Sequence, residues 1–147
     1  MRVLIAGGGI GGLATALALR RIGCDALVCE QAPEIREVGA GITIWSNAVR
    51  ALRALHMEAP VTRLASRIER SRTLADTGRT LADTDIAAIS QDAGAPSLCI
   101  HRADLQNLLR KQLPPDSIRT NTRIESFRLN GAGSSPAPEP KTSKPTS

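Results

Sequence analysis

The chain has 147 residues, of which 41% are hydrophobic and 22% charged, a balance that excludes a wholly disordered protein and suits one domain. Its net charge is +5, but the arginines are scattered and Trp45 and Phe127 are the only aromatic residues, so we expect no nucleic-acid binding. Cys24, Cys29 and Cys99 lack the spacing of a zinc or disulfide motif, and no apolar run is long enough for a membrane span. We therefore expect a cytoplasmic protein that does not bind membranes.

The first thirty residues predict a strand, a helix and a second strand. Residues 2–6 form a short apolar run that ends at three glycines, and we expect a strand buried on both faces. Apolar residues recur at helical spacing over residues 10–22, and Gly23 is placed to end that helix. Residues 26–29 predict the second strand, and its parallel pairing with the first needs the helix as a crossover.

The middle of the chain alternates between short extended runs and helical faces. Ser46 suits the N-cap of a helix, and Gly78 supplies the positive φ that a hairpin turn needs. In chain order we expect a loop at 31–41, a strand at 42–45, a helix from Ser46, a further turn at 61–65, a hairpin within 68–86, a strand at 97–101 and a helix at 105–113.

The C-terminal part contains short strands and a tail. Pro114 and Pro115 end the last helix, and residues 117–120 and 123–129 predict two strands. From Gly131 onward the composition shifts to Gly, Ser, Pro, Thr and Lys with almost no apolar content, which predicts a disordered tail.

Three glycines at the junction of the first strand and the first helix carry the clearest functional signal. Gly7, Gly9 and Gly12 satisfy the pattern G-x-G-x-x-G, and Glu30 ends the next strand as the dinucleotide fingerprint requires. Gly7 permits the tight turn, Gly9 lets the main chain approach a pyrophosphate, and Gly12 lets the helix pack closely on the strand. The helix N-terminus favours the phosphates, and Glu30 accepts hydrogen bonds from a ribose. The fingerprint does not separate FAD from NAD, and a glycine-rich turn beside a surface glutamate is the alternative interpretation.

Further segments narrow the choice of nucleotide. Three segments follow the fingerprint in order: the run Gly39–Ile42, then Asn47 and its helix, then the run His101–Leu105. Together with the fingerprint, they resemble the FAD-dependent aromatic hydroxylases of the salicylate hydroxylase and para-hydroxybenzoate hydroxylase group. The resemblance implies an α/β, Rossmann-like FAD-binding fold of the flavin hydroxylase type, with an incomplete parallel sheet and a β-hairpin insertion. Its implied organisation is a truncated FAD-binding domain at 1–130 with part of an interleaved substrate domain at about 66–101, followed by the Pro/Ser-rich tail at 131–147 that composition predicts to be disordered.

The resemblance also implies a set of ligands. The cofactor is FAD, NADH or NADPH serves as transient reductant, and the substrate is a small aromatic molecule; we assign no catalytic residue and no metal ligand. Alternatives stay open for three positions: a solvated surface residue for Arg36, a pairing with Asp104 for Arg102, and an ordinary strand-core residue for Ile124. The implied cofactor-binding residues are Gly7, Gly9, Gly12, Glu30, Arg36, Gly41, Thr43, Arg102 and Ile124.

Parts of the family pattern are missing from this sequence. The Asp-Gly motif that follows the last strands in the family, and the later Gly-Asp motif, are absent, so we expect no independent turnover. The first strand then lies at an open sheet edge, where a partner chain could pair. Three interpretations remain: a truncated monooxygenase, a dinucleotide-binding module completed by another chain, and a non-catalytic interaction protein.

Overall fold

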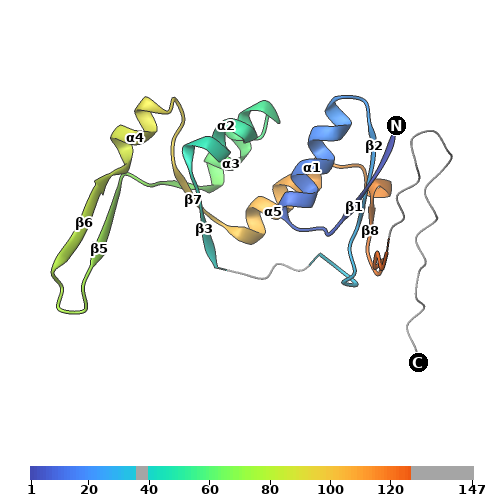
Figure 1. The fold of residues 1–147 in the computed structure, drawn as a ribbon. Helices are drawn as coiled ribbons and strands as arrows, with labels where there is room; N and C mark the ends of the chain where they lie inside the picture. The colour runs from blue at the N-terminus through green and yellow to red at the C-terminus, as the bar shows by residue number, and fades with distance from the viewer. Residues whose placement is uncertain (36–39, 127–147) are drawn as a thin grey trace. The chain divides into compact units, whose positions relative to one another are not determined.

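The computed structural model describes residues 1–35 and 40–126, which divide into two compact units. The first unit joins residues 1–35 to residues 109–126, and the second comprises residues 40–108. Figure 1 follows the chain through both units, and each is described by itself. None of the helices in these ranges is long and apolar enough to cross a membrane.

The first unit is a parallel sheet with a helix packed against it (Figure 1). Strand β1 (Arg2–Ala6) pairs with β2 (Asp25–Cys29), which pairs on its other side with the short β8 (Ile118–Arg119). Helix α1 (Ile10–Arg21) connects β1 to β2 and packs on both, and the 3-10 turn η1 (Pro115–Ser117) precedes β8. The predicted strand, helix and strand at the N-terminus are therefore confirmed.

The core of this unit lies between α1 and β2. On α1, Leu13 and Ala16 are fully buried and Leu17 nearly so, and every residue of β2 from Ala26 to Cys29 is buried. A buried leucine stabilises a fold by about 1.5–3 kcal/mol relative to an exposed one, so this helix face holds the unit together.

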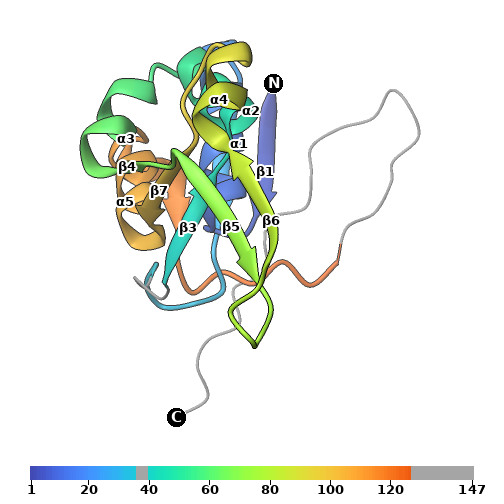
Figure 2. The ribbon, with the colours of Figure 1, turned by 90° about the vertical axis from the view of Figure 1, so that its left-hand side faces the viewer.

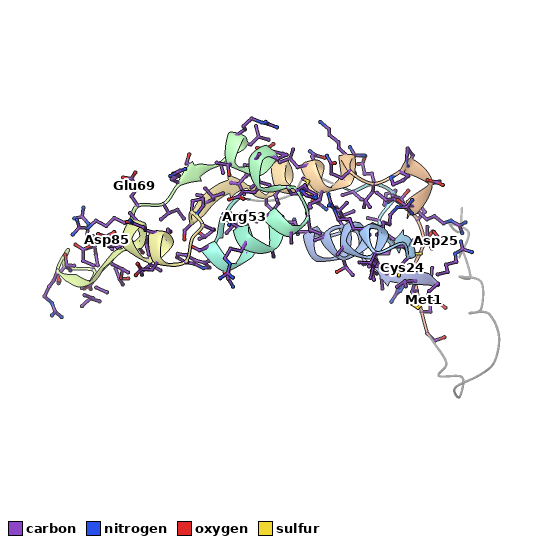
Figure 3. All side chains as sticks on the ribbon, turned by 90° about the horizontal axis from the view of Figure 1, so that it is seen from above. Met1, Cys24, Asp25, Arg53, Glu69 and Asp85 are labelled. Atoms are coloured by element: carbon purple, nitrogen blue, oxygen red, sulfur yellow. The ribbon has the colours of Figure 1, made fainter. Side chains whose placement is uncertain are left out.

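Strand β1 is an edge strand, which confirms the open edge expected from the missing parts of the family pattern and corrects the expectation that the strand is buried on both faces. Its residues alternate, with Arg2, Leu4 and Ala6 exposed. Among the described residues β1 pairs with β2 alone. In Figure 3, Asp25 at the start of β2 lies near Met1, whose carbonyl oxygen accepts the Asp25 N–H at 2.9 Å. One face and one edge of β1 are thus open.

The second unit has a small antiparallel sheet at its centre. Strand β7 (Leu98–His101) lies between β3 (Gly41–Ile44) and β4 (Ser66–Arg67), and Figure 2 shows β3 beside β7. Helices α2 (Ser46–Ala54) and α3 (Glu58–Leu64) pack against each other. The buried apolar side chains of these elements, and of Met57 between the two helices, are Ile44, Val49, Leu52, Met57, Val61, Leu98 and Ile100.

A two-stranded hairpin extends this unit, as predicted. Strands β5 (Arg70–Leu74) and β6 (Thr80–Asp85) are antiparallel, and Gly78 in the turn has φ +82°. The Arg70 guanidinium donates two hydrogen bonds to the Asp83 carboxylate, at 2.6 and 2.8 Å. Every residue of β5 is exposed, so this ribbon adds little to the apolar core.

The helix after the hairpin was not predicted. Helix α4 (Ile86–Asp92) begins where Asp85 accepts the Ala88 N–H at 2.9 Å, an ordinary N-cap. Of its apolar residues, Ile86 is buried while Ile89 is half exposed. Its seven residues are too few for a clear helical period, which explains why the sequence pattern failed to reveal it.

Ser46 does not have its predicted role as an N-cap. It is the first residue of α2, and Trp45 holds the cap position without a side-chain hydrogen bond. The Ser46 hydroxyl is instead buried, 3.1 Å from the Ser97 hydroxyl and 3.4 Å from that of Ser90. Because Ser90 also donates to Ser97 at 3.0 Å, three hydroxyls join α2, α4 and the segment before β7.

The last part of the chain differs from its predicted pattern. Helix α5 (Arg102–Lys111) starts three residues earlier than expected. Of the strand expected at 123–129, residues 123–126 form no strand, and the rest lies outside the described residues. The tail expected at 131–147 also lies outside them.

Helix α1 ends with a glycine in the left-handed conformation, as predicted. Gly23 has φ +79°, and its N–H donates to the Arg20 carbonyl oxygen at 3.0 Å. The Cys24 N–H donates to the Leu19 oxygen, also at 3.0 Å. This pair of bonds is the Schellman motif, which satisfies carbonyls at the helix end.

Helix α2 ends with the same motif, but its left-handed residue is His56, at φ +53°. The His56 N–H donates to the carbonyl oxygen of Arg53 at 2.9 Å, and the Met57 N–H donates to that of Leu52 at 2.8 Å. An L residue is strained in this conformation, whereas glycine is not. His56 therefore occupies a position that glycine suits better.

We predict that His56→Gly raises the free energy of unfolding by about 0.5–1 kcal/mol, because relief of the left-handed strain exceeds the entropy cost of glycine. The matched control is Gly23→Ala, which places a Cβ in the same conformation of α1 and is expected to lower that free energy by about 1 kcal/mol. Denaturant unfolding of the full chain measures both. A His56→Gly chain no more stable than the parent, beside a weakened Gly23→Ala chain, contradicts this account.

Candidate functional site

The glycine turn between β1 and α1 begins with a residue that only glycine suits. Gly7 has φ +105°, a conformation that L side chains rarely adopt. Its N–H donates to the Cys29 carbonyl oxygen at 2.8 Å, which ties the turn to the end of β2. The chain can therefore leave β1 and enter α1 within a few residues.

Gly12, in the first turn of α1, lies against the same turn. A Cβ at Gly12 would be 2.0 Å from the Gly7 carbonyl oxygen and 3.4 Å from Cγ2 of Ile5 on β1. Real Cβ atoms do not come so close to main-chain oxygen, so a side chain here would push α1 away from the turn. The close approach predicted for Gly12 is present, and its tightest contact is with the turn rather than with the strand.

Gly9 differs from both, because the protein leaves space above it. It is the N-cap of α1, its φ of −72° and ψ of 178° suit any residue, and no described atom lies within 4 Å of a Cβ built there. Its carbonyl accepts the Leu13 N–H at 3.0 Å. No side chain caps the helix and its first turn contains no acidic residue, so the N–H groups at the positive end of α1 have no side-chain acceptor from the helix itself.

Glu30 follows β2 and faces the glycine turn. One carboxylate oxygen, Oε2, accepts the Gly8 N–H at 2.7 Å, and the other, Oε1, accepts the Ala32 N–H at 2.9 Å. These N–H groups, that of Ala32 most, hold the pKa of Glu30 below its ordinary value, although partial burial opposes them. The carboxylate is therefore ionised at neutral pH.

Gly8 also has a structural role, which the sequence pattern did not indicate. Gly8 is buried, and a Cβ on it would lie 3.1 Å from Cδ1 of Ile35 and 3.2 Å from Cβ and Oε2 of Glu30. The fingerprint leaves this position free, so the spacing rule gave no reason to select it. The run of three consecutive glycines was the available signal.

The other candidate residues are distributed along the chain. Ile124 belongs to the first unit, is half-buried and lies outside any strand. Gly41 and Thr43 are exposed residues of β3, where Thr43 pairs with Cys99. Arg102 is the half-buried first residue of α5, and its N–H donates to the Ala40 oxygen at 3.3 Å. Gly41, Thr43 and Arg102 belong to the second unit, and Arg36 lies outside the described residues.

The turn, helix and carboxylate together define a dinucleotide-binding α/β unit. A family model described as "FAD binding domain" matches residues 1–144, and the chain belongs to that family. The choice of FAD over NAD, made from the resemblance, is thereby confirmed for the family, as is the Rossmann-like fold class.

Named relatives agree with this membership. The aurachin C monooxygenase/isomerase of Stigmatella aurantiaca is 38% identical over 128 residues, covering 87% of this chain and 33% of the relative. The FAD-dependent urate hydroxylase of Mycolicibacterium vanbaalenii is 34% identical over 135 residues, covering 91% and 34%. A solved structure of Klebsiella pneumoniae HpxO complexed with FAD and uric acid is 25% identical, with a TM-score of 0.77, and the match covers 89% and 33%. The chain thus spans about a third of the length of the relatives it matches.

We predict that Gly12→Ala lowers the free energy of unfolding by at least about 2 kcal/mol, because the new methyl group collides with the Gly7 carbonyl oxygen. Gly11→Ala is the matched control: Gly11 lies in the same helix with no described atom within 4 Å of its Cβ, and alanine should stabilise by up to about 0.5–1 kcal/mol. Denaturant unfolding monitored by circular dichroism measures both changes. Equal effects of the two substitutions would refute the packing role of Gly12.

Proposed function

We propose that this chain is the FAD-binding portion of a flavin-dependent monooxygenase that, when intact, hydroxylates a small aromatic substrate with NADH or NADPH and oxygen. The observation that carries the proposal is the glycine turn, with open space over Gly9, an uncapped helix N-terminus and the ionised Glu30 beside it. The names of the relatives, a monooxygenase/isomerase and a urate hydroxylase, support the reaction class.

The described residues suit the adenosine and pyrophosphate end of the cofactor. The open side of Gly9 and the N–H groups at the start of α1 offer a site for two linked phosphates. Each Glu30 oxygen accepts one main-chain N–H and keeps a lone pair for a ribose hydroxyl. The further contacts that we propose are made by Gly7, Gly12, Arg36, Gly41, Thr43, Arg102 and Ile124.

Bound FAD supplies the redox chemistry of hydroxylation, while the protein binds, orients and shields the reactants. Because the chain spans about a third of its relatives, we propose that it binds nucleotide without turnover of its own. We also propose a cytoplasmic location, which agrees with the free state of Cys24, Cys29 and Cys99.

The test uses Gly9→Ala in the full chain. The methyl group would point into the open space and meet no described protein atom, so the free energy of unfolding should change by less than about 0.5 kcal/mol. The same methyl group would occupy the space of the pyrophosphate, and the affinity for FAD should fall at least about tenfold. Titration with FAD, followed by flavin fluorescence, measures the affinity.

Gly11→Ala is the control, since the fingerprint leaves position 11 free. It should bind FAD as the parent chain does. An unchanged affinity in the Gly9→Ala chain, or a parent chain that takes up no FAD, counts against the proposed site. Oxygen uptake by the parent chain with FAD, NADH or NADPH and an aromatic acid counts against the absence of turnover.

The open edge of β1 favours a second candidate, an interaction module completed by another polypeptide. Among the described residues β1 pairs on one side only, and Leu4 in its centre is 37% exposed. Unpaired edge strands accept a further strand through main-chain hydrogen bonds. The partner that suits this edge is an extended segment with apolar side chains on one face.

This candidate is tested by co-expressing the chain with the later two thirds of the Mycolicibacterium vanbaalenii urate hydroxylase. We expect the two to co-purify, and we expect Leu4→Lys to abolish co-purification because a charge at an edge opposes strand addition. If the two parent polypeptides purify separately, the chain is not an interaction module of this kind.

A further inference from the structure

The Glu30 carboxylate joins two separate stretches of main chain. Its Oε2 accepts the N–H of Gly8, in the turn after β1, and its Oε1 accepts the N–H of Ala32, just beyond β2. Both bonds are short, at 2.7 and 2.9 Å, and both have an ionised acceptor. Hydrogen bonds to ionised groups are about twice as strong as those between neutral groups.

The glycine turn consequently has a protein side and an open side. On the protein side Gly8 is buried, with Glu30 and Ile35 at 3.1–3.2 Å from the position of its absent Cβ. On the open side no described atom lies within 4 Å of the corresponding position on Gly9. The contacts that determine the shape of the turn at Gly8 are therefore made by the protein itself.

We propose that Glu30 is a positioning residue, whose carboxylate holds the Gly8 N–H and so keeps the glycine turn in its phosphate-accepting shape before any nucleotide binds. The inference deepens the proposed function and rests on it for the identity of the ligand. It gives Glu30 a part in phosphate binding as well as in ribose binding, so loss of the carboxylate weakens both.

The geometry requires a carboxylate rather than an amide. Two N–H donors face the two oxygens of Glu30, and glutamine has one acceptor oxygen and one donor NH₂ group. In Glu30→Gln, either Gly8 or Ala32 must lose its acceptor and face another donor. A substitution of nearly identical size thus separates the hydrogen-bonding role from packing.

Main-chain N–H groups, rather than charged side chains, lower the pKa of Glu30. Its pKa is lowered by the N–H groups of Ala32, Gly8 and Gln31, with no charged side chain among the causes. The groups next to it on β2 and β8 are Cys29, whose pKa is raised by burial, and Arg119.

The sign of the pH effect follows from the depressed pKa. The stabilisation by ionised Glu30 is fully present above the unfolded-state pKa of about 4.3 and is lost as the pH falls through the lower, folded-state pKa. The Gly8 amide should report the same step, because its acceptor becomes protonated there.

The experiment follows glycine amides in the ¹⁵N-glycine-labelled full chain without nucleotide. We expect the Gly8 amide resonance to titrate with a midpoint below about 4.3, while that of Gly78, in the hairpin turn of the second unit, does not follow this step. In Glu30→Gln, hydrogen exchange at Gly8 should accelerate at least about tenfold at neutral pH, and the affinity for FAD should fall at least about tenfold. Glu125→Gln, the same charge change at an exposed site, should alter neither.

Each outcome separates the positioning role from the proposed function. A Gly8 amide that neither titrates nor exchanges faster in Glu30→Gln overturns the positioning role, even if the affinity for FAD falls. A Gly8 amide that responds as expected in a chain that takes up no FAD supports the positioning role and rejects the proposed function. If Glu30→Gln does not fold, the titration of Gly8 in the parent chain decides alone.

Discussion

The first unit depends on one close contact, between the start of α1 and the carbonyl oxygen of Gly7. The contact exists because Gly12 has no Cβ, which would stand 2.0 Å from that oxygen. With the helix start fixed there, Leu13, Ala16 and Leu17 face the buried residues of β2. The same contact directs the positive end of the helix towards the open side of the turn, so packing and anion binding share one cause.

The parts that were predictable from the sequence are those that local chemistry determines. The fingerprint glycines, the strand, helix and strand at the N-terminus, and the hairpin turn at Gly78 all follow from residues a few positions apart. The end of α1 at Gly23 is of the same kind, since it requires one residue that tolerates positive φ. His56 adopts a similar conformation without glycine, which a composition rule cannot anticipate.

The parts that were not predictable depend on tertiary neighbours. The apolar run of β1 by itself predicts a strand buried on both faces, and its edge position followed only from the missing parts of the family pattern, because burial depends on which strands flank it. Ser46 has the composition of a cap, yet its hydroxyl bonds to residues more than forty positions away. The contact between Glu30 and Gly8 spans 22 positions and involves a main-chain N–H, which no side-chain pattern records.

The trio of hydroxyls from Ser46, Ser90 and Ser97 has a consequence for how the second unit opens. Beyond the sheet β3-β7-β4, helix α4 and the hairpin bury few apolar groups, and Arg53 donates a hydrogen bond to the Gly94 oxygen in the turn after α4, at 3.0 Å. Polar bonds thus carry much of the attachment of residues 70–92. We therefore expect this segment to open as a separate cooperative subregion, at a lower free energy than the apolar centre of the unit requires.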